Sequence, residues 1–457
     1  MNRSVYSRRE MLRSTSCGFG YLALASLAAE SSFADGKAVN PLAARAPHHP
    51  ARAKRVIFMF MAGGPTQHET FDYNPELIKS AGKSQTITVN GNTRTGELMG
   101  PVYKFERYGQ SGLYLSELFP HLGKHADDIC LLNGMHTDSA AHPQASIQLH
   151  TGSFTFVRPS MGSWILYGLG AENQNLPGFV TINPAGIGGA QNYGAAFLPA
   201  TYQGTPVNTA LGNIPNIKNP SLGVDDQRRQ LDFIQQLNRD YMEHVQVDNQ
   251  VEGLIQSYEL AFRMQAAVPE TMSMDKEPES IKDLYGINDP ATRVFGTQCL
   301  LARRLAESGV RFIEISADGW DHHNNLTNRM AVLSKSIDKP MGALLADLKA
   351  RGMLDDTLVV WGGEFGRSTI AQNNDGRQHN SRGYSMWVAG GGFKAGFRYG
   401  STDVAGDAVE GKIHLHDLHA TLLHLVGINH EKLTYRYAGR DFRLTDVYGR
   451  VVNEILA

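Results

Sequence analysis

Short apolar runs that end in glycine or polar residues recur along the chain, and this pattern constrains the fold more than any other feature. The first run covers residues 55–61 and is followed by Gly63-Gly64-Pro65. A short, continuously apolar run is typical of a strand buried on both faces of a parallel sheet. Similar runs occupy residues 128–133, 178–182, 310–315, 357–361 and 384–389.

Helical patterns alternate with several of these runs. They cover roughly residues 225–266, 291–308, 327–351 and 416–427. Gly309 is placed to cap the second of them directly before the run that begins at residue 310. The alternation predicts an α/β fold with a mostly parallel central sheet flanked by helices.

Two stretches interrupt the alternation. Residues 79–112 contain a hairpin pattern around Asn90-Gly91-Asn92, and residues 184–224 are rich in Gly, Pro, Asn and Ala without periodicity. Long connections without regular structure are uncommon in a folded domain unless they form lids or binding loops. We therefore expect both stretches to be insertions that lie over the active face.

The N-terminus has the features of a twin-arginine export signal over residues 1–34. Arg8-Arg9 precedes a weakly apolar run that is too short to span a bilayer, and Ser32-Phe33-Ala34 is a suitable cleavage site. Residues 35–53 are rich in Ala, Pro and His and are expected to form a flexible lead-in to a domain at residues 54–457. The chain is thus predicted to be periplasmic or otherwise extracytoplasmic.

Charge and cysteine content exclude several classes of function. The 457 residues include 43 Lys and Arg against 45 Asp and Glu, so there is no basic excess for binding nucleic acid. No further segment is predicted to span a membrane. Of three cysteines, Cys17 lies in the export signal, while Cys130 and Cys299 have apolar neighbours and are expected to be buried thiols.

Polar residues gather after the predicted strands, where the carboxyl ends of parallel strands share one edge of the sheet. Their carboxylates and imidazoles are ligands that Zn²⁺ and Mn²⁺ accept. Asp321-His322-His323 is the strongest group, although a single histidine is more commonly a hydrogen-bonded core or surface residue. Glu364 and Arg367 fit either the metal site or a structural ion pair. These polar segments are residues 63–72, 136–142, 318–324, 362–368 and 375–379.

Five ordered motifs resemble a family of exported bacterial proteins, the domain-of-unknown-function 1501 family, which belongs to the alkaline phosphatase and sulfatase superfamily. The resemblance covers nearly all of the chain after residue 34. Residues 417–428 also look like the helix near the end of sulfatases. The motifs are Gly63-Gly64-Pro65 with Phe71-Asp72, Trp320-Asp321-His322-His323, Gly363-Glu364-Phe365-Gly366-Arg367, Gly376-Arg377-Gln378-His379 and Ala389-Gly390-Gly391-Gly392.

The resemblance implies one or two divalent ions, Zn²⁺ or Mn²⁺, and hydrolysis of phosphate or sulfate esters. Two departures from the catalytic relatives stand out. The first strand ends in Gly63-Gly64 where those relatives have acidic residues, and Glu364-Phe365 replaces an Asp-His pair. The positions that match metal ligands are Asp72, Asp321, His322 or His323, Glu364 and His379.

The nucleophile of the superfamily is a Ser, Thr or Cys nine residues before a Thr-Gly pair. In this chain the pair is Thr151-Gly152, and nine residues earlier stands His142. Ser139 has the more familiar local sequence but lies three residues too early. Either His142 is a nucleophile or a ligand, or Ser139 moves into place, or ester hydrolysis has been lost. If the chain is a hydrolase, we expect Arg367 or Arg377 to clamp the ester oxygens and His142 to act as nucleophile or base.

Two functions follow from these features. The first is an exported metal-dependent hydrolase of phosphate or sulfate esters, acting on a small molecule or a polysaccharide. The second is a non-catalytic protein on the same fold that binds a glycan or an exported partner. The retained Asp321-His322-His323 and His379 favour the first, whereas Gly63-Gly64 and the absence of a hydroxyl at position 142 favour the second.

Overall fold

The computed structural model describes residues 40–209, 221–244, 249–373 and 375–457. The predicted export signal and residues 35–39 of the predicted lead-in lie outside these residues. Residues 40–54 contain no helix or strand. They run along the folded part of the chain through backbone hydrogen bonds such as Arg45 N–H to the Leu169 carbonyl, 2.9 Å.

A nine-stranded sheet forms the centre of the unit made by residues 41–457. All eight residues of β1 except Arg55 are buried, as expected of a strand covered on both faces. Eight strands lie in the order β14-β6-β13-β10-β1-β9-β7-β8, and β17 pairs with β6. Their bounds are β1 Arg55–Ala62, β6 Ile129–His136, β7 Phe179–Ile182, β8 Thr205–Val207, β9 Phe312–Asp318, β10 Thr357–Gly362, β13 Tyr384–Ala389, β14 Phe397–Tyr399 and β17 Ile413–His414.

The sheet is mostly parallel, which confirms the predicted fold class. β1 pairs in parallel with β10 and β9, and β7 pairs in parallel with β9 and β8. β13 alone runs against the others, since it is antiparallel to both β10 and β6. Consequently β1, β6, β9 and β10 all end at the same edge of the sheet.

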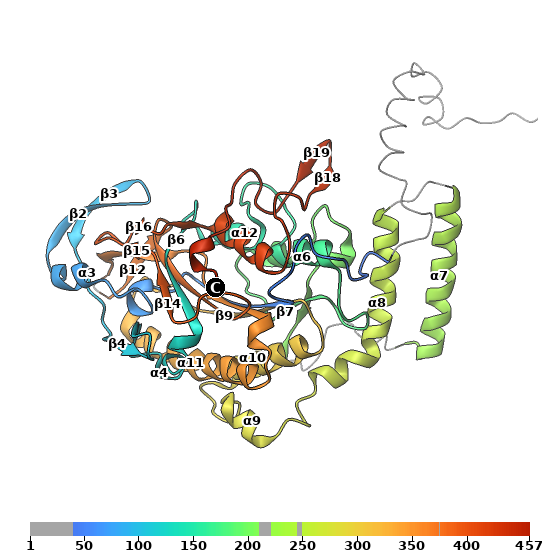
Figure 1. Ribbon diagram of the computed structural model, residues 1–457, viewed down its shortest axis with the longest axis horizontal. Helices are drawn as coiled ribbons and strands as arrows, with labels where there is room; N and C mark the ends of the chain where they lie inside the picture. Colours follow the sequence, from blue (N-terminus) through green and yellow to red (C-terminus); the bar gives the residue numbers. More distant parts are fainter. Residues whose placement is uncertain (1–39, 210–220, 245–248, 374) are drawn as a thin grey trace, which may run out of the picture. The chain divides into compact units, whose positions relative to one another are not determined.

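Helices cover both faces of this sheet. In Figure 1, α10 and α11 lie on one side and α6 and α12 on the other. α10 packs on β9, and α6 packs on β9 and β7. The helices are α3 Pro75–Ser80, α4 Pro120–Gly123, α5 His142–Thr151, α6 Met161–Leu169, α7 Val224–His244, α8 Asn249–Met272, α9 Glu279–Leu284, α10 Arg293–Glu307, α11 Leu326–Ala350 and α12 Leu415–Leu425.

Five small two-stranded sheets decorate the domain. The hairpin expected around Asn90-Gly91 is present, and at its turn the Asn90 side-chain amide donates to the His379 carbonyl at 2.8 Å. The described part of the 184–224 insertion packs on α5 through Ser146, whose hydroxyl donates to the Ile187 carbonyl. The pairs are β2 Ser84–Val89 with β3 Asn92–Glu97, β4 Phe105–Tyr108 with β5 Leu113–Ser116, β11 Gly366–Ala371 with β12 Arg377–Asn380, β15 Ser401–Thr402 with β16 Ala408–Glu410, and β18 Tyr435–Tyr437 with β19 Arg440–Phe442.

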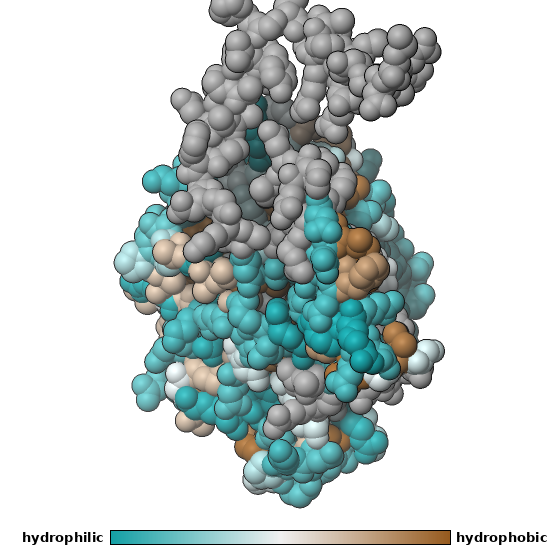
Figure 2. All heavy atoms as spheres, turned by 90° about the vertical axis from the view of Figure 1, so that its right-hand side faces the viewer, coloured by the Kyte–Doolittle hydropathy of each residue, from teal (hydrophilic) through white to brown (hydrophobic). Residues whose placement is uncertain are grey.

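The face that carries α7 and α8 is mainly hydrophilic, with hydrophobic residues in separate spots (Figure 2). Phe233 and Leu237 of α7 are among the exposed apolar residues. No helix within the described ranges has the length and apolar character needed to cross a membrane. Cys130 and Cys299 are both buried and unbridged, as the sequence predicted.

Candidate metal centre

Four polar side chains meet at the carboxyl edge of the sheet. His142 begins α5 after β6, Asp321 and His323 follow β9, and His379 lies on β12. One ligand atom from each can be chosen so that all four atoms lie within 4.8 Å of one another. The edge predicted from parallel strands is therefore where these residues converge.

The Nε2 atoms of the three imidazoles surround one oxygen of Asp321. Oδ1 of Asp321 lies 3.3 Å from His142 Nε2, 3.0 Å from His323 Nε2 and 3.3 Å from His379 Nε2. The Nε2 atoms of His323 and His379 are themselves only 2.9 Å apart. All four side chains are partly exposed, so a ligand can reach them from solvent.

The other ring nitrogen of each imidazole faces an oxygen acceptor. Nδ1 of His142 is 2.6 Å from the Glu364 carboxylate, and Nδ1 of His323 is 2.7 Å from the Gln372 amide oxygen. Nδ1 of His379 is 2.7 Å from the Ala140 carbonyl. In metal sites, ligating histidines almost always donate this second N–H to a carboxylate or a carbonyl, which fixes the tautomer and leaves the Nε2 lone pair for the ion. All three histidines have this arrangement.

Glu364 is held in place by the two glycines that end β1. Its buried carboxylate accepts the Gly63 N–H at 3.0 Å and the Gly64 N–H at 3.1 Å. A side chain at Gly63 would clash, because a Cβ there would lie 2.6 Å from the Asp321 nitrogen and the residue has φ +118°. Glu364 thus acts on the cluster through His142.

The electrostatic environment of the cluster favours a protonated His142 imidazole beside the carboxylates of Asp321 and Glu364. Burial opposes the imidazolium, but the nearby carboxylates of Asp321 and Glu364 raise the pKa of His142 to about 9. Burial alone would raise the pKa of Asp321, yet the close contacts with His142, His379 and Arg367 lower it far below its usual range. Burial is the main reason that the pKa of His379 is lowered. Asp321 is therefore ionised and His379 neutral near pH 7.

The donor set fits a divalent transition metal. Three imidazole nitrogens and one carboxylate oxygen are ligand types that Zn²⁺ and Mn²⁺ accept, and one ligand atom from each residue lies within 4.8 Å of the others. Nε2 of His142 is buried without a hydrogen bond of acceptable geometry, so it has an unused lone pair or proton directed at the cluster. Leaving such a polar atom unsatisfied is costly unless something binds there.

Neither arginine predicted as an ester clamp is exposed. Arg367 is 0% exposed, and its guanidinium donates to the carbonyls of Gly63 and Gly64 and to Asp321 Oδ1 at 2.6 Å. Arg377 is also 0% exposed and pairs with Glu69 at 2.7 Å. Both guanidiniums are thus buried among protein groups: Arg367 contacts the end of β1 and Asp321, and Arg377 contacts Glu69 and the carbonyls of Met99 and Gly100.

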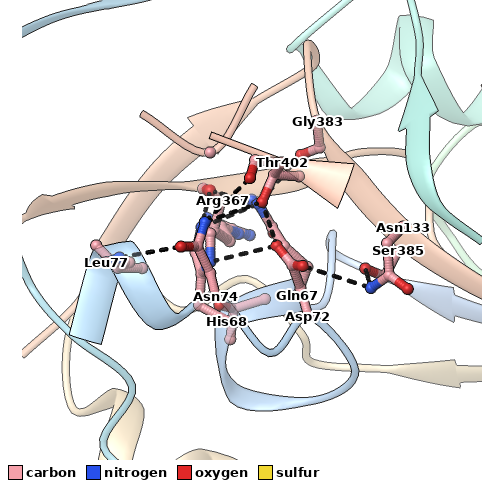
Figure 3. Close-up of polar contacts among 12 residues, drawn as sticks. Gln67, His68, Asp72, Asn74, Leu77, Asn133, Arg367, Gly383, Ser385 and Thr402 are labelled. Atoms are coloured by element: carbon pink, nitrogen blue, oxygen red, sulfur yellow. Dashed lines mark hydrogen bonds and ion pairs between the residues drawn. The ribbon is translucent and has the colours of Figure 1, made fainter. Parts of the chain in front are cut away.

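Asp72 and His322 lie outside the cluster. The Asp72 carboxylate points toward Asn133 and accepts the Thr402 hydroxyl (Figure 3). Between β1 and Asp72 the chain makes a turn at residues 67–69. The Gln67 side chain there forms hydrogen bonds with the backbone N–H and carbonyl of Arg367. His322 is 0% exposed, and burial lowers its pKa to about 3, so it is a neutral core residue beside the ligand His323.

Ser139 lines an open cavity of about 660 Å³ next to the cluster. Its hydroxyl accepts the Ala141 N–H at 3.2 Å, and the neighbouring Ala140 carbonyl bonds His379. Arg382 is the one cation among the lining residues, and about half of its side chain is exposed. None of the four cluster residues lines this cavity, but its Ala140 wall contacts the cluster through His379.

Sequence patterns did not reveal two supports of the cluster, Gln372 and the Ala140 carbonyl. Gln372 lies in an irregular turn after β11 and belongs to none of the quoted motifs. The Ala140 carbonyl is a backbone group, and no side-chain motif can identify it. These two oxygen acceptors can be identified only from the folded structure.

Comparisons with known proteins give a family but no activity. The chain matches the family described as "Protein of unknown function (DUF1501)" over residues 53–456. A search of curated protein sequences found no match. Similar solved structures include the lipoteichoic acid synthase LtaP from Listeria monocytogenes, at 10% identity over 88% of this chain and 78% of that chain, with a TM-score of 0.37.

Two further solved structures have the same TM-score of 0.37. The PsFucS1 sulfatase from Pseudoalteromonas sp. is 13% identical over 83% of this chain and 69% of that chain. A protein in the alkaline phosphatase superfamily from Vibrio parahaemolyticus is 12% identical over 93% of this chain and 75% of that chain. Superpositions this loose carry no argument about chemistry, so the proposals below depend on the residues of this chain.

Proposed function

The chain belongs to the DUF1501 family, whose description assigns no activity, and from its own site we propose that it is a metal-dependent hydrolase of phosphate or sulfate esters. One observation carries the proposal. Three histidines direct Nε2 at the Asp321 carboxylate while each Nδ1 faces an oxygen acceptor. Purely structural histidines have no reason to share this arrangement.

We propose Zn²⁺ or Mn²⁺ as the ion held by His142, Asp321, His323 and His379. When bound, such an ion supplies Lewis-acid activation of the ester and of water. Glu364 and the Ala140 carbonyl fix the rings of His142 and His379, so the donor atoms are in place before the ion arrives. The Arg367 guanidinium donates to Asp321 Oδ1 at 2.6 Å and so fixes the position of this carboxylate.

The substrate would enter through the cavity that contains Ser139 and Arg382. Arg382 is placed to attract an anionic ester, because it is the half-exposed cation there. Its ion pair with Asp407, at 2.8 Å, sets the position of the guanidinium. His142 acts as a ligand and not as a nucleophile in this proposal, because its Nε2 faces the cluster.

Paired variants at His142 and Ser139 test this proposal with an aryl phosphate and an aryl sulfate as substrates. His142→Ala should lower metal content and reduce kcat/KM by ~10²-fold or more, while Ser139→Ala should keep the metal. If Ser139→Ala also abolishes turnover with metal bound, Ser139 is the nucleophile. If His142→Ala keeps both metal and turnover, the metal site is wrongly placed.

A binding protein on the same fold is the second candidate. Its supporting observation is that His142 occupies the position where the superfamily resemblance expects a hydroxyl or thiol nucleophile. Metal-loaded protein without turnover on either ester class would favour it. We also propose that the chain is exported by the twin-arginine route, on the basis of Arg8-Arg9 and the weakly apolar run after it.

A further inference from the structure

A second open cavity, which we call the α5 groove, lies beside helix α5. Its volume is about 620 Å³, and its lining includes Asp138, Gln148, Phe156, His414 and Tyr448. Asp138 also lines the cavity that contains Ser139. The two cavities therefore share a wall, and a molecule bound in the groove could extend toward the metal cluster.

Exposed aromatic rings form one side of the α5 groove. Phe156 is 62% exposed and Tyr448 is 61% exposed. The Tyr448 ring stacks on His416 with centroids 5.2 Å apart and planes within 3° of parallel, so its orientation is fixed although it faces solvent. Large exposed rings grouped at a concavity are typical of binding surfaces.

Fixed hydrogen-bonding groups form another side. Asp138 pairs with His414 at 3.2 Å and accepts the Gln148 side-chain amide. Its hydrogen bond from His414 is the main reason that the pKa of Asp138 is lowered to about 2. The groove thus presents an ionised, immobilised acceptor beside apolar rings.

The lining excludes several kinds of ligand. It contains Asp138, Asp417 and Asp446 but no lysine or arginine, and the nearby Arg158 lies over the Phe156 ring at 5.4 Å, so the lining side chains themselves favour a neutral group over a sulfate or phosphate. An acyl chain would take the Asp138 carboxylate out of water without a new hydrogen bond, which is costly. A neutral sugar suits both sides, because its C–H faces pack on aromatic rings while its hydroxyls donate to carboxylates.

We propose that the α5 groove binds neutral sugar residues of a polysaccharide whose ester group reaches the metal cluster. That the ester group reaches the metal cluster rests on the proposed function, whereas the binding of neutral sugar does not. The exposed rings of Tyr448 and Phe156 provide the contact area, and Asp138 orients the hydroxyls.

The test is isothermal titration of the metal-loaded full-length protein with neutral hexaoses of glucose, xylose, mannose and galactose, and with the cationic hexamer of glucosamine. At least one neutral hexaose should bind, and Tyr448→Ala should weaken that binding by at least tenfold. Tyr437→Ala is the matched control, because Tyr437 is 50% exposed but stacks on Phe197 outside the groove lining. Metal content is measured in all variants.

Absence of binding to every neutral hexaose would overturn the inference, and so would binding of the cationic hexamer alone. Equal losses in Tyr448→Ala and Tyr437→Ala would also overturn it. The proposed function fails separately. If protein without metal or turnover still binds a neutral hexaose through Tyr448, the sugar site stands and the hydrolase does not.

Discussion

Replacing Glu364 by Gln should weaken metal binding although Glu364 is not itself in the four-residue cluster. The carboxylate accepts N–H groups from Gly63 and Gly64 through backbone contacts of 3.0 to 3.2 Å and faces His142 Nδ1 at 2.6 Å. Glutamine has only one acceptor oxygen, so its NH₂ group must face either His142 or the glycine amides. Either placement turns an acceptor contact into a clash between donors.

The magnitude follows from the number and kind of lost contacts. At least two hydrogen bonds to a buried charge are lost, at ~1.5–3 kcal/mol each, so unfolding of the metal-free protein should become easier by ~3–6 kcal/mol. Changes to groups that orient metal ligands typically cost ~10–100-fold in metal affinity. Glu364→Gln should therefore raise the Kd for Zn²⁺ by ~10–100-fold.

Glu314→Gln is the matched control for this experiment. Glu314 is also a buried carboxylate paired with a histidine, His150 Nε2 at 3.2 Å, on the same helix α5 that begins with His142. It should lower stability but leave the Kd for Zn²⁺ unchanged in titrations of chelator-stripped protein. A Kd for Glu364→Gln within threefold of the wild type would refute the reasoning, and so would an equal loss in both variants.

Three further predictions follow. Burial raises the pKa of Asp72 to about 6. The protonated carboxyl therefore favours folding below pH ~4, and this contribution is lost as the pH rises through 6. Between pH 4 and 7 the free energy of unfolding of Asp72→Asn, measured by chemical denaturation, should rise by up to ~3 kcal/mol relative to the wild type, with metal content unchanged. Elemental analysis should find the metal lost in His379→Gln and kept in His322→Gln, because only His379 belongs to the cluster; the opposite ranking would show that the wrong histidine was assigned. Replacing Arg8 and Arg9 by Lys should leave the precursor in the cytoplasm, and undiminished mature protein outside the inner membrane would contradict the twin-arginine route.

The sheet could be predicted because a short apolar stretch of sequence is enough to identify a buried strand. A run such as residues 55–61 must be covered on both faces, and each predicted run became a strand of the central sheet. Strand direction is not local information. The run at residues 384–389 is mainly apolar like the parallel strands, yet β13 runs antiparallel because only the short β11–β12 hairpin and its flanking loops separate it from β10.

Whether a predicted site residue joins the cluster depends on the path of the chain after each strand. His323 and Asp321 follow β9 directly, and His142 is positioned by the start of α5, so their positions along the chain suffice to bring them together. Asp72 stands ten residues beyond β1, and the turn at residues 67–69 carries it toward Asn133 and Thr402. A motif shared with relatives shows that a residue matters, but the intervening turn decides what the side chain contacts.

The two glycines at the end of β1 show how a departure from the superfamily pattern can be offset elsewhere. Gly63-Gly64 removes the acidic side chains that the resemblance expects there, which by itself argues against a metal site. The buried backbone N–H groups of these glycines instead donate to the carboxylate of Glu364, which comes from the end of the neighbouring strand β10. A carboxylate thus still lies beside the cluster, but it contacts His142 and is not one of the four cluster residues. A sequence comparison that checks one position at a time cannot detect this exchange, because it joins residues 300 positions apart.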